Sequence, residues 1–350
     1  MKIMINSYNN IMIDIKFSLP GHGSNLTFKN FHGNNQEQKI NYHINSEISQ
    51  ADGWIVLENL KHETETCIVP KNNIFYLNNE TSYKKNHYFD NHMVEFLNQF
   101  SKGFGCYATK HKNYVSNTPT FSPWMIHANH GDAVFQESNL DFDYFSKLNN
   151  LEKSIDLSII CSSKSNTENH SLRLEFVKIL KNHFGERLHW YGNGINTIEK
   201  KSDIIFKSKY HIAIENGSRN NLVTEKLYDS FLGLSFPIYY GATNIGELFD
   251  KDSFISIDIN DVSNSIKTIE DVLKSDMYTE NFNQLLDSKN KVLTEFNIHS
   301  RLNKLVEENI STNPSTSEEI TLHSSDWYWK KTTSNKKKIK RILMRRMRLH

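Results

Sequence analysis

Two pairs of polar residues in the second half of the chain have the chemistry of a site for a phosphate-containing ligand. Glu215 and Asn216 end one apolar run, and Glu225 and Lys226 open the next apolar segment after the polar loop 217–222. The start of a helix carries partial positive charge from its free backbone N–H groups, and a lysine there adds a full charge, which suits phosphate. Carboxylate and amide oxygens accept hydrogen bonds from hydroxyl groups. A surface helix that merely begins with Glu225 and Lys226 is the simpler alternative.

The elements that position these residues follow from hydrophobic patterning. Apolar runs predict strands at residues 155–161, 188–191, 209–216, 235–241 and 252–259, and helical periodicity predicts helices at 169–185 and 224–233. Strands that alternate with helices form a parallel sheet with helices on both faces. Ligands of such sheets bind beyond the carboxyl ends of the strands, which is where Glu215 and Asn216 stand.

The first half of the chain shows the same trend less clearly. Strands are predicted at Lys2–Asn6, Trp54–Leu57 and Ile74–Leu77, and a helix is predicted from about Asp90, with a buried stripe of Met93, Phe96, Leu97 and Phe100. The length of 350 residues fits two domains of about 150 residues each. We therefore predict two α/β domains facing each other across a cleft, at 1–150 and 151–310, followed by a polar linker and basic tail at 311–350.

The order of short motifs between Lys209 and Ile257 resembles the donor-binding segment of the α-1,3-fucosyltransferases, glycosyltransferase family 10, of the bacterial type. The chain reads IEN, VTEKL, FPIYYG and DSFISI where the family reads FEN, YVTEKL, PVVYG or PIYWG, and DSFI. Ile214 and Leu222 stand where the family places a phenylalanine and a tyrosine. The resemblance implies a GT-B-like fold of two Rossmann-like domains, and transfer of L-fucose from GDP-fucose with inversion.

The resemblance also implies a set of donor-binding residues. The stretch CSSKSNTENHSLRLEFVKIL is similar to the family's serine-rich turn and following helix, and it places Arg173 in the first turn of that helix. Arg173 and Lys226 would neutralise the diphosphate, and Glu225 would accept hydrogen bonds from sugar hydroxyls, with Glu215 and Asn216 beside it. Two alternatives stay open, namely a surface position for Arg173 and a buried, loop-capping role for Glu215.

An acidic residue in the first half is the candidate catalytic base. Inversion needs one group to take the proton of the acceptor hydroxyl as that hydroxyl attacks. The stretch NIFYLNNETS is similar to a family segment in which an aromatic-rich strand ends in a glutamate, proposed there as the base, and this implies that role for Glu80. A plain surface turn is the alternative. By the same resemblance, the acceptor is an N-acetylglucosamine or glucose unit of a surface glycan, often lipopolysaccharide.

We expect that no metal or other cofactor is required, because the predicted cations can neutralise a diphosphate; a non-essential divalent metal stays open. Asp141 and Asp143 form a D-x-D pattern of the kind that many transferases use to hold a metal, but so short a pattern arises easily by chance. Within the enzyme class, the alternative is another GDP-deoxyhexose donor. From a different class, the alternative is a catalytically silent glycan- or membrane-binding protein.

The charge of the chain is segregated at its C-terminal end. Residues 330–350 hold ten of the 41 lysines and arginines and no acidic residue, which leaves 31 basic and 40 acidic residues elsewhere. One helical face of this tail carries Ile339, Ile342, Leu343 and Met347. A basic helix with one apolar face is typical of a helix that lies on anionic lipid. Nucleic acid is disfavoured as a partner, because the body is acidic and no base-reading motif is present, and a solvated tail stays open.

The remaining features concern the compartment. The three cysteines lie far apart, which fits a reducing environment. The N-terminus lacks the layout of a signal peptide, and no run of about 18 apolar residues occurs. We therefore expect a cytoplasmic protein that associates peripherally with the inner face of the membrane through Lys330–His350.

Overall fold

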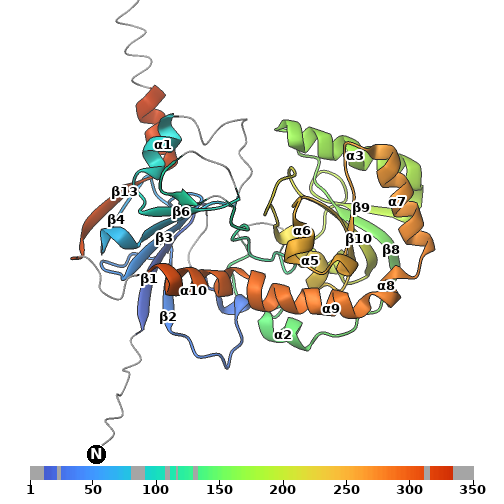
Figure 1. The fold of residues 1–350 in the computed structure, drawn as a ribbon, viewed down its shortest axis with the longest axis horizontal. Coiled ribbons are helices and arrows are strands. Elements are labelled where there is room, and N and C mark those ends of the chain that lie inside the picture. Colours follow the sequence, from blue (N-terminus) through green and yellow to red (C-terminus); the bar gives the residue numbers. More distant parts are fainter. Residues whose placement is uncertain are drawn as a thin grey trace, which may run out of the picture.

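The computed structural model describes residues 12–21, 25–79, 91–106, 111–115, 117–128, 133–310 and 316–333 (Figure 1). They form two units, each built around its own parallel sheet. The units lie side by side, and α9 (Phe282–Lys291) and α10 (Ile298–Asn309) run along one edge of both (Figure 1). This is the predicted GT-B-like arrangement of two Rossmann-like α/β domains.

The first unit contains a six-stranded parallel sheet in the order β2-β1-β3-β5-β6-β7. Its strands are β1 (Ile13–Ser18), β2 (Ile40–Ile44), β3 (Gly53–Leu57), β5 (Ile74–Leu77), β6 (Lys102–Phe104) and β7 (Tyr114–Val115). The strands predicted at 54–57 and 74–77 are confirmed, and Lys2–Asn6 lies outside the described residues. The predicted helix is confirmed as α1 (Asn91–Leu97), and every residue of its predicted stripe is buried.

The second unit contains a five-stranded parallel sheet in the order β12-β11-β10-β8-β9. Its strands are β8 (Ile155–Ile160), β9 (Leu188–Tyr191), β10 (Ser208–Ile214), β11 (Phe236–Tyr240) and β12 (Ile255–Ser256). All five predicted strands are present, and the two predicted helices are α3 (Glu168–Phe184) and α5 (Glu225–Leu232). Every residue of β10 except Lys209 is buried, as expected for a central strand covered on both faces.

Shorter helices connect these elements. They are η1 (Lys29–Phe31), η2 (Lys71–Asn73), α2 (Phe142–Lys147), η5 (Gly185–Arg187), α4 (Ser202–Ile205), α6 (Ile245–Leu248), η6 (Lys251–Ser253), α8 (Met277–Glu280) and the π-helical turn η7 (Val292–Phe296). The longer α7 (Val262–Lys274) packs Ile269 and Val272 into the core of the second unit.

The chain returns to the first unit after the second sheet is complete. On α10, Asn303 accepts a hydrogen bond from Tyr42 at 3.0 Å, and Asn309 accepts one from Lys102 at 2.9 Å. The apolar side of α10, with Leu302 and Val306, lies in a cluster that also contains Tyr228 of the second unit, so α10 joins the two units.

The C-terminal part of the described chain is folded onto the first unit. Strand β13 (Glu318–His323) pairs antiparallel with β4 (Thr64–Val69), and residues 325–333 are helical. The sequence predicted a polar linker and tail from residue 311, so residues 318–333 correct that boundary. The strand escaped prediction because Ile320 and Leu322 are its only apolar residues, and the other four residues of the strand are polar.

The two units share apolar contacts that hold them together. Phe31 of the first unit packs against Trp124 with ring centroids 4.7 Å apart, in a cluster that also contains Tyr228 and Phe296 from the second unit. Leu222, which follows the second sheet's central strand, is 1% exposed and packs into a first-unit cluster around Tyr76. These contacts fix the facing edges of the two sheets relative to each other.

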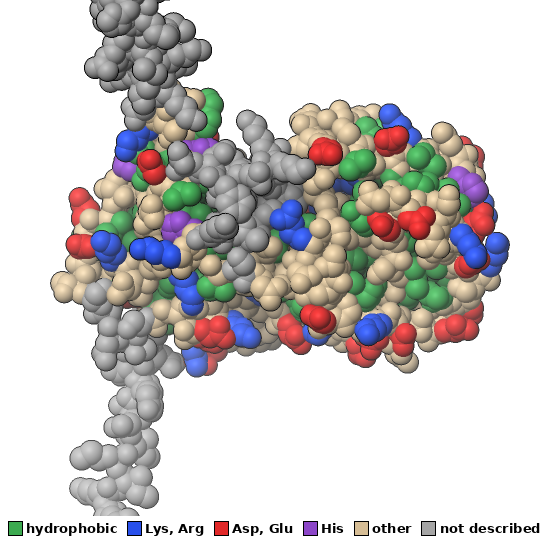
Figure 2. Space-filling model, turned by 45° about the horizontal axis from the view of Figure 1, so that its top comes forward, with side chains coloured by type: hydrophobic (Ala, Val, Ile, Leu, Met, Phe, Trp, Pro, Cys, Tyr) green, Lys and Arg blue, Asp and Glu red, His purple; other side chains and the backbone are tan. Residues whose placement is uncertain are grey.

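The surface carries charges of both signs. Acidic and basic side chains are interspersed over the face shown in Figure 2, on both units. Within the described part of the chain, no helix combines the length and the apolar character needed to cross a bilayer.

Candidate functional site

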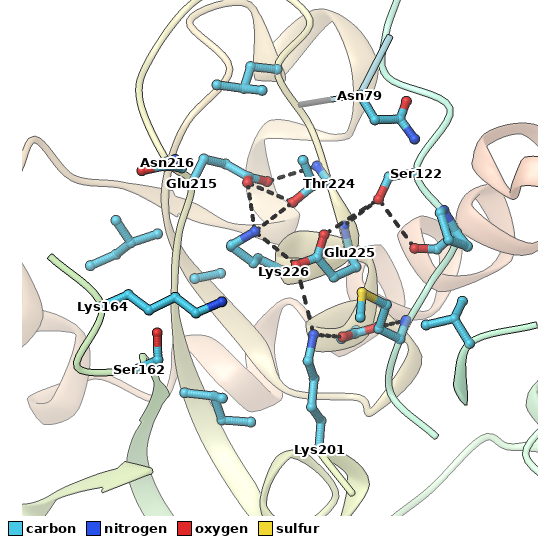
Figure 3. A pocket seen from close by; sticks show the side chains of 18 of the residues that line it. Asn79, Ser122, Ser162, Lys164, Lys201, Glu215, Asn216, Thr224, Glu225 and Lys226 are labelled. Atoms are coloured by element: carbon cyan, nitrogen blue, oxygen red, sulfur yellow. Dashed lines mark hydrogen bonds and ion pairs between the residues drawn. The ribbon is translucent and has the colours of Figure 1, made fainter. Parts of the chain in front are cut away.

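A cleft of about 770 Å³ lies between the carboxyl edges of the two sheets (Figure 3). Its first-unit wall includes Glu58 and Asn79, which follow β3 and β5, and its second-unit wall is formed by the segments that follow β8 and β10. This is the edge at which parallel sheets bind ligands. All five residues predicted to bind the donor line this cleft, namely Arg173, Glu215, Asn216, Glu225 and Lys226.

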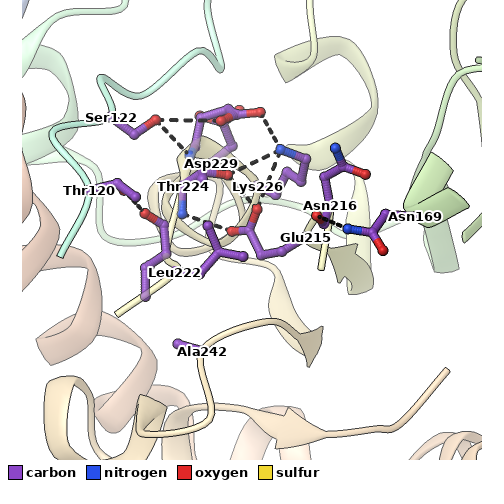
Figure 4. A network of polar contacts seen from close by, with 12 residues as sticks. Thr120, Ser122, Asn169, Glu215, Asn216, Leu222, Thr224, Lys226, Asp229 and Ala242 are labelled. Carbon is purple, nitrogen blue, oxygen red and sulfur yellow. Dashed lines mark hydrogen bonds and ion pairs between the residues drawn. The ribbon is translucent and has the colours of Figure 1, made fainter. Parts of the chain in front are cut away.

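Glu215 shapes the turn from β10 into α5. Its side chain is buried; Oε1 accepts a hydrogen bond from the Thr224 N–H at 2.8 Å, and Oε2 accepts one from the Thr224 hydroxyl at 2.6 Å (Figure 4). Burial raises the pKa of Glu215, and the positive charge of Lys226, 3.4 Å away, opposes that rise. Glu215 therefore has the loop-capping role that the sequence left open as an alternative.

The start of α5 has fewer free N–H groups than the sequence predicts. The N–H of Thr224 is bonded to Glu215, and that of Glu225 donates to the hydroxyl of Ser122 at 3.2 Å. The N–H of Leu227 returns to the Thr224 carbonyl at 3.2 Å. Buried amides take the acceptors within reach. The prediction that this helix start receives a phosphate through its backbone is therefore corrected for Thr224 and Glu225.

Lys226 lies between two carboxylates. Its Nζ is 2.8 Å from Glu225 Oε1 and 3.4 Å from Glu215 Oε2. Burial favours the neutral amine, but the two carboxylates outweigh burial and raise the pKa of Lys226 above its usual value. Burial would also raise the pKa of Glu225, yet Lys226 and Lys201 together hold it well below its usual range. Glu225 and Lys226 are therefore both charged at neutral pH.

Lys201 supports the Glu225 carboxylate from the other side. Its Nζ lies 3.9 Å from Glu225 Oε1 and 2.8 Å from Asp229 Oδ2, one turn further along α5. The second oxygen of Asp229 accepts a hydrogen bond from the Met125 N–H at 2.8 Å. Burial raises the pKa of Asp229 to about 6, although Lys201 pulls it down. The buried Asp229 and the partly buried Lys201 thus form an ion pair next to Glu225.

Arg173 is a buried cation that faces the cleft. Its side chain lies on the inner face of α3 and is 8% exposed, and its Nε has no hydrogen-bond partner among the described residues. The surface alternative for Arg173 is therefore wrong. A buried donor without an acceptor costs free energy until one is supplied, and a guanidinium pairs best with an anion. The position of Arg173 thus predicts where the anionic part of a ligand binds.

The main chain around Arg173 is held by two side-chain contacts. Thr167 caps α3 by accepting a hydrogen bond from the His170 N–H at 3.1 Å. Asn169 donates to the Asn216 carbonyl at 3.1 Å (Figure 4), which ties the first turn of α3 to the end of β10. Arg173 and Lys226 are thereby held on the same wall of the cleft.

Glu80, the predicted base, lies outside the described residues. The residue before it, Asn79, lines the cleft and accepts a hydrogen bond from the Phe121 N–H at 2.6 Å. Glu58, at the end of the neighbouring strand, accepts a hydrogen bond from the Asn79 N–H and has a φ of 65°, a conformation that few residues other than glycine adopt. The chain therefore reaches the cleft at Asn79.

The two aspartates of the D-x-D pattern have structural partners. Asp141 caps α2 by accepting a hydrogen bond from the Tyr144 N–H at 2.9 Å. Asp143 accepts one from the Asn34 side chain at 2.7 Å. Among the residues that the structure describes, no group of three or more His, Cys, Asp and Glu side chains is arranged to hold a metal ion.

Four residues of the site were not predicted from the sequence, namely Ser122, Met125, Lys201 and Asp229, because their contacts join segments far apart in the chain. Ser122 and Glu225 are 103 positions apart, Lys201 and Asp229 are 28 apart, and Met125 and Asp229 are 104 apart. One signal was available, because Asp229 follows Glu225 by four positions on a predicted helix and such residues share a face.

We predict that Lys201→Met destabilises the fold by about 3–5 kcal/mol near neutral pH, because it leaves the buried charge of Asp229 unpaired. The folded-state pKa of Asp229 is already raised to about 6, above its unfolded value, so stability falls as pH rises through that window. Without Lys201 this pKa rises further, and the loss becomes smaller at acid pH. Urea unfolding at about pH 5 and about pH 8 measures the difference.

Lys200→Met is the matched control, because Lys200 is exposed and precedes Lys201 in the chain. Adding Asp229→Asn to Lys201→Met should recover much of the lost stability, since an asparagine keeps the acceptor for Met125 without a charge. Equal losses for the two lysine variants, or a loss that does not change with pH, would contradict the pairing.

The second unit is similar in sequence to known fucosyltransferases. Residues 153–304 match the family model "Glycosyltransferase family 10 (fucosyltransferase) C-term". The chain is 27% identical over 132 residues to the human 4-galactosyl-N-acetylglucosaminide 3-alpha-L-fucosyltransferase 9, a match that spans 36% of each chain. It is also 27% identical over 60 residues to the alpha-(1,3)-fucosyltransferase FucT of Helicobacter pylori, over 17% of this chain and 13% of that one. The chain thus spans about a third or less of the length of these curated relatives.

Two solved structures named as alpha1,3-fucosyltransferases also match the chain. A crystal structure of alpha1,3-fucosyltransferase has a TM-score of 0.45 and 16% identity, covering 82% of this chain and 83% of that one. A crystal structure of alpha1,3-fucosyltransferase with GDP has a TM-score of 0.43 and 16% identity, covering 85% and 95%. All the predicted donor-side residues lie within residues 153–304, the segment that matches the model of glycosyltransferase family 10, the fucosyltransferases.

Proposed function

We propose that this chain is an inverting fucosyltransferase that moves L-fucose from GDP-fucose to a hydroxyl group of a glycan. The observation that carries the proposal is Arg173, a buried cleft cation whose Nε lacks a hydrogen-bond partner among the described residues, within the segment that matches the fucosyltransferase family. Its planar N–H groups can bind a diphosphate through two parallel hydrogen bonds. Lys226 supplies a second cation on the same wall.

In the proposed reaction, the acceptor hydroxyl attacks the anomeric carbon of fucose as the bond to the GDP oxygen breaks. Glu80 takes the proton of the attacking hydroxyl, and GDP leaves with the bonding electron pair. Arg173 and Lys226 stabilise the charge that develops on the diphosphate. The charged Glu225 accepts hydrogen bonds from the sugar, held in place by Lys226, Lys201 and Ser122. This set of groups needs no metal ion.

The second substrate of the proposed reaction is the glycan acceptor. The cleft's first-unit wall, which includes Asn79 and Ser122, would bind it. By the family resemblance we propose an N-acetylglucosamine or glucose unit of a surface polysaccharide or lipopolysaccharide, linked in the α-1,3 manner. The alternative donor is another GDP-deoxyhexose, and the observation that favours it is Leu222, which stands where the family has a tyrosine and is buried in a first-unit cluster.

We predict that the purified chain releases GDP from GDP-fucose in the presence of acceptor, and does so in EDTA. Arg173→Gln should lower kcat/KM by about 30-fold or more, because removing one partner of a buried charged contact costs about 2 kcal/mol or more. GDP release from a panel of GDP-sugars, followed by mass spectrometry, measures the donor preference of the wild type and the kcat/KM of the variant.

Arg187→Gln is the matched control, because Arg187 is an exposed arginine just beyond the end of α3. It should leave GDP release unchanged. Release from a different GDP-deoxyhexose alone would establish the alternative donor. The absence of release with every donor would reject catalysis and favour a silent binding protein.

We predict that Glu80→Gln retains GDP-fucose binding but lowers kcat by roughly 10²–10⁴, the usual contribution of a positioned general base. Calorimetry measures the binding, and single-turnover kinetics measure the transfer. Glu95→Gln, a change at an exposed position of α1, is the control. A Glu80→Gln variant that turns over at nearly the wild-type rate would exclude Glu80 as the base.

We also propose that Lys330–His350 holds the protein at the inner, anionic face of the cytoplasmic membrane, with no nucleic-acid partner. The described beginning of this segment contacts the first unit, because Lys330 pairs with Glu63 at 2.9 Å. Lys331 lies 4.9 Å from the ring centre of Trp327, one turn earlier on its own helix. Residues 334–350 lie outside the described residues and carry most of the basic charge. Each basic residue near an anionic surface contributes roughly 1 kcal/mol.

We predict that deleting residues 334–350 abolishes sedimentation with anionic vesicles while GDP release from GDP-fucose continues. The deletion begins after the described helix, so the contacts of Lys330 and Lys331 are kept. Changing Ile339, Ile342, Leu343 and Met347 to serine, with every charge retained, should weaken sedimentation less than the deletion. Unchanged sedimentation of the truncated protein would defeat the membrane proposal.

A further inference from the structure

His170 is a titratable residue of the cleft that the reaction proposed above does not use. It lies in the first turn of α3, one turn before Arg173, and lines the same cleft. Its Nδ1 is buried and has no hydrogen-bond partner among the described residues. Residues three apart on a helix share a face. His170 therefore stands beside Arg173 on the wall where an anionic group is expected.

The charges that act on His170 are cationic and come from three directions. Lys164 belongs to the loop between β8 and α3, Arg173 lies on the histidine's own helix, and Lys226 lies on α5. Figure 3 shows the side chain of Lys164 extending into the cleft toward Lys226. Burial lowers the pKa of His170, and the three cations lower it further. The imidazole of the free protein is therefore neutral near neutral pH.

A bound diphosphate would favour the protonated form of His170. A nucleotide sugar carries two negative charges on its diphosphate, and these offset the cations around the imidazole. An opposite charge within about 4–6 Å favours the charged form of a titratable group. The buried Nε of Arg173, next to His170, is a second and independent sign that this wall is built for an anion.

We propose that His170 is a further ligand of the donor's diphosphate and contacts it as an imidazolium that forms when the donor binds. The proposal rests on the proposed function of the cleft. The proton comes from solvent, so donor binding consumes up to one proton and no covalent bond changes. By linkage, a donor that favours the protonated histidine is itself bound more tightly when that protonation is easier, at lower pH.

The test is calorimetric titration of the full chain with GDP-fucose at about pH 6 and about pH 8, in buffers with different protonation enthalpies. GDP-fucose is the right probe because neither phosphate of its diester titrates in this range, unlike the terminal phosphate of GDP. We expect proton uptake on binding and tighter binding at the lower pH, about tenfold for each unit by which the donor raises the pKa of His170. His170→Gln should bind more weakly and show less proton uptake and less pH dependence.

His183→Gln is the matched control. His183 lies on the same helix, but it is exposed and paired with Glu270 at 2.9 Å on the outer surface, so this variant should match the wild type in affinity and proton uptake. Wild-type-like uptake in His170→Gln would overturn the proposal, and so would a loss of affinity without a change in uptake. If the wild type fails to bind GDP-fucose at either pH, the proposed function itself is wrong, which is a separate outcome.

Discussion

Glu215 places a carboxylate at the end of the central strand of the second sheet, where water is almost excluded. A buried carboxylate is costly unless it is paired and hydrogen-bonded. Here the N–H and hydroxyl of Thr224 and the ammonium of Lys226 meet that requirement. These contacts close the turn between β10 and α5 in one conformation. The direction in which Glu225 and Lys226 leave the start of α5 is a consequence of this turn.

The first unit also holds the segment around the start of α5 in place. Ser122 holds the Glu225 N–H, Met125 donates to Asp229, and Thr120 donates to the Val223 carbonyl. The first-unit segment that contains Thr120 and Ser122 is itself held by α10. Arg301 of that helix donates to the Thr120 carbonyl and lies 4.1 Å from the ring centre of Phe121. Helix α5 is therefore held by the first unit as well as by its own sheet. Positioning of this kind makes a rigid site from two domains.

The parts of this structure that could be predicted are those that local pattern determines. Strand β10, helices α3 and α5, and the arrival of Glu215 and Asn216 at the ligand edge follow from hydrophobic periodicity and the rule for parallel sheets. The positions of Ser122 and Lys201 could not be predicted, since both depend on contacts between segments far apart in the chain. The prediction of free N–H groups at the start of α5 was wrong for the same reason. Their acceptors, the side chains of Glu215 and Ser122, come into place only in the folded chain.

The charges around the cleft are unequally divided between its ends. Glu215, Glu225 and Asp229 meet Lys226 and Lys201, so the end at α5 has one more carboxylate than lysine. The end at α3 has Arg173 and Lys164, with His170 between them and Lys226. Carboxylates suit the hydroxyl groups of a sugar, and cations suit phosphates. Lys226 lies where the two ends meet, so in the proposed reaction its charge would act on the phosphate next to the sugar both before and during the departure of GDP. A nucleotide sugar has hydroxyl groups at one end and a negatively charged diphosphate next to them. The charges of the cleft therefore favour a donor whose sugar lies at the α5 end and whose diphosphate lies at the α3 end.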